Sequence, residues 1–266
     1  MNMMQMLGIV LFFYFVSLIF ICLYRDVVNV KVWNAVFITA DVIAFFCWNI
    51  AAYQRGWLDK RFMTLDNISP LMCTVIPLTC FMKDSIRQAA LSAIACLSLG
   101  MFLAMLISPE HAYLFNFNIE ANFLYTSEAI CHMVCSLFGV YLMQTGQVKP
   151  NFKAWWKSIA FMFSIITFGV ALNIIFHKDF FGMDPYGNYR IYMLDIFGSF
   201  EATLLAYYLG VFLVLTFGLQ VGQLMEKTNK KREKQSLLTA DMCIKEEREK
   251  VNNEVVVALS QPEEER

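Results

Sequence analysis

The sequence predicts an all-α membrane protein, a polytopic bundle of about seven transmembrane helices. Three observations lead there: the apolar content, the scarcity of charge and the long uncharged stretches. Of the 266 residues, 58% are hydrophobic and 16% are charged, whereas soluble domains carry about 25% charged residues. This composition excludes a disordered chain, a basic surface that binds nucleic acid and most soluble enzymes.

The charges gather at the C-terminal end of the chain. Residues 226–266 hold 9 of the 21 Lys and Arg and 10 of the 22 Asp and Glu. We therefore expect a transmembrane domain over residues 1–225 and a charged cytoplasmic tail over residues 226–266, partly helical or disordered. The basic cluster from Lys227 to Lys234 is predicted to anchor the orientation, and it is also a candidate site for anionic lipid headgroups.

The apolar stretches define the expected helices. Crossing a hydrocarbon core of about 30 Å takes about 20 apolar residues. The seven candidate spans are Gln5–Tyr24, Val32–Tyr53, Ile68–Met82, Gln88–Ile107, Asn122–Met143, Trp155–Phe176 and Ile196–Leu219. The third is short, and Pro70 and Pro77 should bend or interrupt it, which a bilayer tolerates where neighbouring helices satisfy the freed backbone groups. The first lacks the basic region of a signal peptide, so we interpret it as a retained helix.

The loop charges predict the orientation. Seven spans place 7 Lys and Arg, together with the 9 of the tail, on one side of the membrane and 5 on the other. The positive-inside rule then puts the tail in the cytoplasm and the N-terminus outside. The membrane would be the plasma membrane of a bacterium, or the endoplasmic reticulum or another endomembrane of a eukaryote.

A few polar side chains lie inside the predicted spans. An ionisable group in hydrocarbon is costly, so such groups usually face the bundle interior and often mark function. The residues singled out on this ground, or by their position beside the prolines, are Asp41, Asn49, Cys73, Thr74, Glu128, His132, Asn173 and Glu201.

Glu128 and His132 are four residues apart and share one helical face. A carboxylate beside an imidazole fixes its tautomer and raises its basicity, as a general base requires. A Cys within reach of that imidazole would become a nucleophilic thiolate. The alternative is that both side chains only bond to neighbouring helices and fix the packing. The spacing leaves both interpretations open.

Two other site types follow from the same residues. Cys131, His132 and Cys135 suggest a metal site, with Cys73 or Cys80 as further ligands. Cys135 lies within a turn of the other two, but Cys131 and His132 point about 100° apart on a helix, so no metal or other cofactor is predicted. Asp41, Glu128, His132 and Glu201 would line the path of an ion or proton carrier. Against a carrier, the chain has no pair of broken helices in matching halves.

The order of several short motifs is informative as a set. They are Tyr53-Gln54-Arg55-Gly56-Trp57, Ser69-Pro70-Leu71-Met72-Cys73, Gly100 with Ser108-Pro109-Glu110, Cys131-His132-Met133, Asn173 and Phe200-Glu201-Ala202. This order resembles the YwaF-like integral membrane proteins, a family that groups bacterial proteins with eukaryotic transmembrane acyltransferases acting on phospholipids. The resemblance runs from about residue 45 to residue 219.

The resemblance implies acyl chemistry on membrane lipids, with phospholipid or lysophospholipid acyl chains as substrates. By position, Cys73 would be the nucleophile and His132 its base, with Glu128 orienting the ring. Thr74 is a second nucleophile, because a related group of membrane hydrolases uses Thr with His to cleave fatty-acid esters. Asn49 or Asn173 would donate a hydrogen bond to the oxyanion. The alternatives are such a lipid ester hydrolase and a non-enzymatic transporter.

Overall fold

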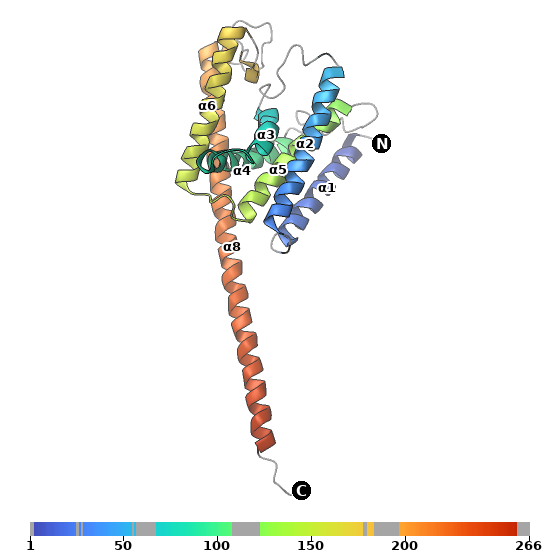
Figure 1. The fold of residues 1–266 in the computed structure, drawn as a ribbon, viewed down its shortest axis with the longest axis vertical. Helices are drawn as coiled ribbons and strands as arrows, with labels where there is room; N and C mark the ends of the chain where they lie inside the picture. Colours follow the sequence, from blue (N-terminus) through green and yellow to red (C-terminus); the bar gives the residue numbers. More distant parts are fainter. Residues whose placement is uncertain are drawn as a thin grey trace. The chain divides into compact units, whose positions relative to one another are not determined.

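The computed structural model describes residues 3–24, 27, 29–54, 56, 68–107, 123–177, 180–183 and 197–259. These residues form helices and turns and no strand, so the predicted all-helical class is confirmed. The elements are α1 (Met3–Tyr24), α2 (Val30–Gln54), α3 (Ile68–Leu78), α4 (Asp84–Ile107), α5 (Phe123–Gln144), α6 (Phe152–Phe176), the 3-10 turn η3 (Phe180–Gly182) and α8 (Phe200–Leu259) (Figure 1).

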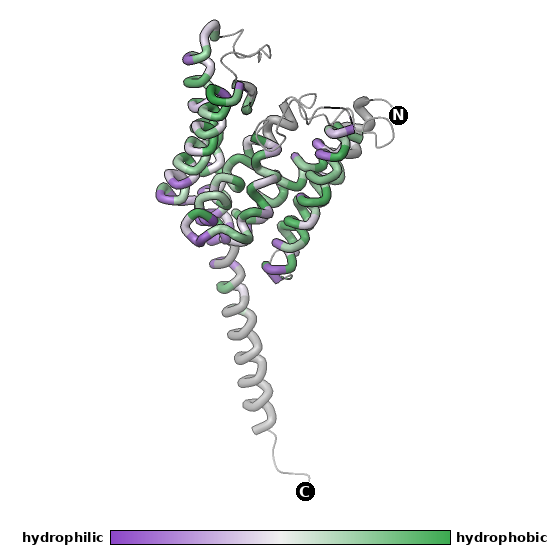
Figure 2. The backbone as a smooth tube through the Cα atoms, turned by 45° about the horizontal axis from the view of Figure 1, so that its top comes forward, coloured by the Kyte–Doolittle hydropathy of each residue, from purple (hydrophilic) through white to green (hydrophobic). Residues whose placement is uncertain are grey.

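Several of these helices suit a membrane. Within the described residues, four stretches are long and apolar enough to cross one: Val30–Gln54, Thr126–Gln144, Phe152–Phe176 and Phe200–Lys231. Two more, Leu11–Tyr24 and Ile68–Leu78, are apolar but shorter. Figure 2 shows the hydrophobic residues running along these helices, with hydrophilic residues near several of the helix ends. The chain is therefore described as a helical membrane protein, while the count of seven spans stays a prediction.

The chain divides into two compact units, Met1–Gln223 and Leu224–Arg266. The first holds α1 to η3 and the opening part of α8. The second continues α8 as a helix to Leu259, and a salt bridge of 2.6 Å joins Glu226 to Lys230 one turn later. The described part of the tail is thus helical without a break.

Prolines limit the short helix α3. Pro70 lies in its first turn, where the missing N–H removes no helical hydrogen bond. Pro77 lies inside the helix, which ends one residue later at Leu78. The chain then turns through Thr79–Phe81 before α4 begins. We expected both prolines to disturb the helix, but only Pro77 stands where it can.

Two helices form the centre of the first unit. In the most apolar 18-residue stretch of α5, 83% of the residues are buried, compared with 33% in α2 and in α6. In α4, every residue from Ala89 to Leu99 is buried. Neighbouring elements cover these parts of α4 and α5, whereas α1, α2, α6 and α8 expose large apolar side chains. Their outer faces are apolar, as in the stripe of Leu205, Leu209 and Leu213 on α8, which is typical of contact with lipid.

Small residues let the central helices approach closely. Gly139 of α5 lies against Ser98 of α4, and a Cβ at that position would overlap the Ser98 side chain. Gly218 of α8 lies against Cys96 of α4, where a Cβ would be 2.5 Å from both the Cα and the carbonyl oxygen. Close backbone contact through small residues is how helices associate in membranes, where apolar burial gives little driving force.

Candidate functional site: a buried cluster of thiols and a carboxylate

The core of the first unit holds a cluster of polar side chains from three helices. Asp41 of α2, Cys73 of α3 and Cys135 of α5 have exposed fractions of 0%, 1% and 0%. The Cys73 and Cys135 sulfur atoms are 3.5 Å apart. The Cys135 thiol donates to Asp41 Oδ1 at 3.6 Å, and one ligand atom of each residue lies within 4.8 Å of the other two.

Cys131 borders the same cluster. It lies one helical turn before Cys135, so both thiols share a face of α5. Its side chain is fully buried. We call Asp41, Cys73, Cys131 and Cys135 the thiol–carboxylate cluster.

Aromatic packing holds α2 against α5 beside this cluster. The ring of Phe37, one turn before Asp41, lies 5.3 Å from the ring of Phe138 and 5.2 Å from that of Tyr141. Such ring pairs stabilise a contact by about 0.5–1.5 kcal/mol beyond their buried area. The rings fix the register of the two helices, which sets Asp41 opposite Cys135.

One atom of the cluster is unsatisfied. Asp41 Oδ2 is buried and has no hydrogen-bond partner among the described residues. A buried polar atom without a partner costs about 1–3 kcal/mol, and more if it is charged. Native cores retain few such atoms, and an exception at a cluster of reactive side chains points to a function.

His132 and Glu128 lie on α5 as predicted, both buried with 7% of their surface exposed. His132 follows Cys131 directly and so points about 100° away from it around the helix. Its Nδ1 atom has no hydrogen-bond partner in the described part of the chain. The hydrogen bond described for Cys73 runs to Cys135, and none is described to His132.

The other predicted site residues have separate surroundings. The Thr74 hydroxyl donates to the Pro70 carbonyl at 3.0 Å, and the Asn49 amide donates to Phe45 O at 2.7 Å. Both are local bonds within one helix. Glu201 is exposed in the first turn of α8. These three residues are not joined to the cluster by any described hydrogen bond.

Asn173 has a structural role near the end of α6. Its amide nitrogen donates to the carbonyl oxygens of Phe180 and Met183, both at 2.8 Å. Its side-chain oxygen accepts the Phe180 N–H at 2.7 Å. The side chain is fully buried and holds the η3 turn against α6. With its polar groups engaged in this way, it has no donor left for an oxyanion.

Sequence reasoning missed the central part that Cys135 plays. The i, i+4 spacing of Cys131 and Cys135 was the available signal, since both thiols then face one neighbour. The sequence places Cys135 only in a candidate metal set with Cys131 and His132, with Cys73 or Cys80 as further ligands, and His132 points elsewhere. The joining of Asp41 to Cys73 also could not be read from the sequence, because they lie on different helices.

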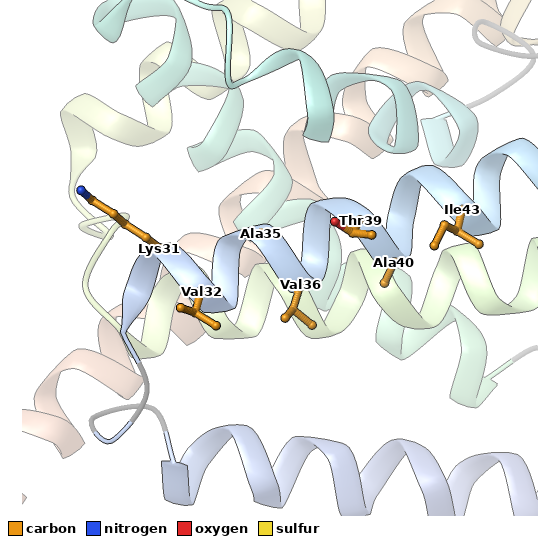
Figure 3. Close-up of a pocket in the computed structure, with 7 residues that line it drawn as sticks. All are labelled: Lys31, Val32, Ala35, Val36, Thr39, Ala40 and Ile43. Atoms are coloured by element: carbon orange, nitrogen blue, oxygen red, sulfur yellow. The ribbon is translucent and has the colours of Figure 1, made fainter.

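A groove lies elsewhere on α2. It has a volume of about 610 Å³ and is lined by Lys31, Val32, Ala35, Val36, Thr39, Ala40 and Ile43. Figure 3 shows Val32, Val36 and Ala40 pointing to one side of α2. Val32 and Val36 are more than half exposed, whereas Asp41 is fully buried. The groove is therefore part of the outer apolar surface and is separate from the cluster.

Some predicted features lie outside the described residues. They include Arg55 and Trp57 of the first motif, the Ser108-Pro109-Glu110 motif and the connection charges Arg25, Lys60, Arg61, Lys178 and Arg190. Comparison of the chain with protein-family models, curated proteins and solved structures finds no match. The thiol–carboxylate cluster therefore carries the functional argument.

Proposed function

We propose that this chain is an integral membrane protein that transfers or hydrolyses lipid acyl groups through Cys73. The observation that carries the proposal is the placement of Cys73. It is buried on the short helix α3 beside a carboxylate that has an unsatisfied oxygen. A nucleophilic thiol needs a nearby proton acceptor, and Asp41 is the acceptor that this arrangement offers. The resemblance to the YwaF-like proteins agrees with this chemistry.

The proposed reaction has two steps. The Cys73 thiol passes its proton to Asp41, and its sulfur bonds to the carbonyl carbon of a lipid ester. The carbon–oxygen bond breaks, and the leaving alcohol takes the proton. A lysolipid hydroxyl or water then attacks the thioester, the carbon–sulfur bond breaks, and the proton of the attacking group returns to Cys73. Transfer and hydrolysis differ only in this second acceptor.

His132 keeps a part in the proposal as a second proton acceptor. It is buried on α5 next to Cys131, and its Nδ1 atom has no hydrogen-bond partner among the residues that the structure describes. It has no described hydrogen bond with Cys73, so a change of side-chain rotamer would have to precede proton transfer. Thr74 is the weaker nucleophile, because its hydroxyl proton is held by the Pro70 carbonyl.

We further propose seven spans with the N-terminus outside and the tail in the cytoplasm. Asn34, near the start of α2, and Gln147, between α5 and α6, form hydrogen bonds of 2.9 and 3.3 Å. The start of α2 and the α5–α6 connection therefore share one end of the first unit. Lys31, Lys149 and Lys153 belong to that end, which the positive-inside rule favours as cytoplasmic. The basic residues from Lys227 to Lys234 then lie on the side that has anionic lipid headgroups. Attraction to these headgroups stabilises membrane binding by about 1 kcal/mol for each Lys or Arg near the surface.

The test is to trap the acyl-enzyme. The purified chain in phospholipid vesicles is incubated with a phospholipid carrying a tagged acyl chain, and labelled residues are mapped by mass spectrometry. We expect a hydroxylamine-sensitive label on Cys73 that is lost in Cys73→Ala. Cys96→Ala is the matched control, because Cys96 is also buried but lies outside the cluster.

Three other results would overturn the Cys73 mechanism. Labelling that moves to Thr74 would indicate a Thr hydrolase. Equal lipid turnover in Cys73→Ala and in the parent protein would exclude the nucleophile. Ion flux that is lost in Asp41→Asn or Glu201→Gln, but kept in Cys73→Ala, would favour a carrier instead.

A further inference from the structure

We propose that Asp41, Cys73 and Cys135 form a binding site for Zn²⁺ inside the helix bundle. Zn²⁺ binds Cys thiolates, imidazole nitrogen and carboxylate oxygen, usually in a tetrahedron. Three of the four residues in the thiol–carboxylate cluster present one such atom each, from three different helices, within 4.8 Å of one another. This inference is independent of the proposed acyl chemistry and needs no catalytic activity.

The distances between the ligand atoms fit a metal at their centre. Zinc–sulfur bonds of about 2.3 Å at tetrahedral angles place two sulfurs about 3.8 Å apart, and a sulfur and a carboxylate oxygen about 3.6 Å apart. In the cluster, Cys73 Sγ and Cys135 Sγ are 3.5 Å apart, and Cys135 Sγ and Asp41 Oδ1 are 3.6 Å apart. Both distances lie within a few tenths of an ångström of those expected around a zinc ion, and Asp41 and Cys73 present ligand atoms within 4.8 Å of each other.

The unsatisfied oxygen is a second and independent observation. Asp41 is fully buried, and its Oδ2 atom has no hydrogen-bond partner in the described residues. A cation between the carboxylate and two thiolates would compensate the negative charge that makes such a group costly to bury. The Cys135 thiol donates to Oδ1, and no described residue donates to Oδ2.

The ligand types select the metal. Two thiolates favour Zn²⁺ over Mg²⁺ and Ca²⁺, which prefer oxygen, while the carboxylate disfavours Cu(I), which prefers thiolate and thioether ligands. Cys131 lies one turn before Cys135 on α5 but is not among the ligand atoms that lie within 4.8 Å of one another. Three protein ligands leave a fourth position open for water, as in catalytic zinc sites.

Zinc binding and acyl transfer would compete. The lone pair of the Cys73 thiolate either bonds to the metal or attacks a carbonyl carbon, and it does not do both at once. Zinc would also lock α2, α3 and α5 together through one ligand from each. If the proposed function holds as well, we expect Zn²⁺ to inhibit it.

The test uses Co²⁺ as a spectroscopic substitute for Zn²⁺ in the purified full-length chain in detergent. We expect one Co²⁺ per chain, a thiolate-to-cobalt charge-transfer band, and the strong visible absorption of tetrahedral coordination. Added Zn²⁺ should remove both signals, and its Kd follows from that competition. Absence of the charge-transfer band in the parent protein would overturn the inference.

Substitutions then assign the ligands. We expect Cys135→Ser, Cys73→Ser and Asp41→Asn each to weaken Zn²⁺ binding by about 100-fold or more, since loss of an outer-shell partner alone costs about 10- to 100-fold. Cys96→Ser, a buried thiol outside the cluster, and Cys80→Ser, an exposed one, are the controls and should bind as the parent does. Equal weakening in the controls would overturn the assignment. Helicity by circular dichroism identifies a variant that does not fold, in which case the parent spectrum decides.

The two proposals fail in different ways. If the parent protein shows the cobalt–thiolate spectrum but no acyl label, the acyl chemistry is rejected and the zinc site stands. Acyl labelling of Cys73 without any cobalt–thiolate band, in chelator-treated protein, would reject the zinc site and leave the acyl chemistry.

Discussion

The sulfur atoms of Cys73 and Cys135 lie 3.5 Å apart, although 62 positions separate the two residues along the chain. Cys73 comes from the short helix α3 and Cys135 from the central helix α5. Their contact places the Cys73 thiol of the short helix α3 against α5, the most buried of the described helices. Asp41 of α2 completes the contact from a third direction.

Removing the charge of Asp41 should abolish function without lowering the stability of the protein. Asp41→Asn keeps the size of the side chain but removes a carboxylate that has an unsatisfied buried oxygen. We expect the free energy of unfolding to stay equal or to rise by about 1 kcal/mol, while zinc binding and acyl labelling are lost. Thermal unfolding, monitored by size-exclusion chromatography, measures the change in stability. The cobalt competition and the acyl-labelling experiment measure the loss of zinc binding and of acyl transfer.

Asp84→Asn is the control for this prediction. Asp84 is an exposed acid in the first turn of α4, where its charge stabilises the helix by about 0.3–1 kcal/mol. The Asp84→Asn substitution should therefore lower the free energy of unfolding slightly and leave metal binding unchanged. A loss of more than about 2 kcal/mol in Asp41→Asn would show instead that the carboxylate is needed for the fold.

Close packing of α8 on α4 predicts a strong effect at Gly218. A Cβ there would meet the backbone of Cys96, which cannot move aside as the end of a side chain can. We expect Gly218→Ala to lower the free energy of unfolding by about 1–3 kcal/mol. Denaturant titration in detergent micelles provides the measurement. Gly210→Ala on the same helix meets nothing within 4 Å, and should be neutral or stabilising because Ala is the better helix former.

The Asn173 side chain should be essential to the turn after α6. It makes three hydrogen bonds to the backbone of Phe180 and Met183, and the same turn holds Phe181 at a φ of 54°. We expect Asn173→Ala to cost about 2–4 kcal/mol, because it leaves buried backbone groups unpaired. Thermal melting compares it with Asn49→Ala, which removes a single bond within one helix. Similar losses in the two variants would contradict this role.

Opposite ends of α2 should label from opposite sides of the membrane. Lys153 shares one end of the first unit with the start of α2, through the Asn34–Gln147 hydrogen bonds and the Asn151 cap of α6. Gly56 follows the other end of α2, a helix of 25 residues and so about 37 Å long. In sealed vesicles of known orientation, a membrane-impermeant maleimide should reach Lys153→Cys from the cytoplasmic side and Gly56→Cys from the outside. The parent protein gives the background of the native thiols, and labelling of both from one side would contradict the topology.

The sequence by itself determined the class of the protein and most of its helix positions. A run of apolar side chains about 20 residues long has few alternatives to a helix in a bilayer, because every backbone group must bond within its own segment. The same reasoning singled out Asp41, Cys73 and His132, since polar groups are conspicuous in such runs. The predicted helix ends were less accurate: the last helix runs from Phe200 to Leu259 as one element, far beyond its apolar part.

The tertiary structure decided which of the singled-out residues meet. Helical spacing relates residues on one helix, as with Glu128 and His132, but contains no information on how helices rotate against one another. That rotation depends on side-chain packing, as in the Phe37–Phe138 contact and at Gly139 and Gly218. It turns Cys135 toward Cys73 and Asp41. Asn173, an oxyanion candidate by sequence, is instead committed to the backbone of the η3 turn, because the chain folds back onto α6 there.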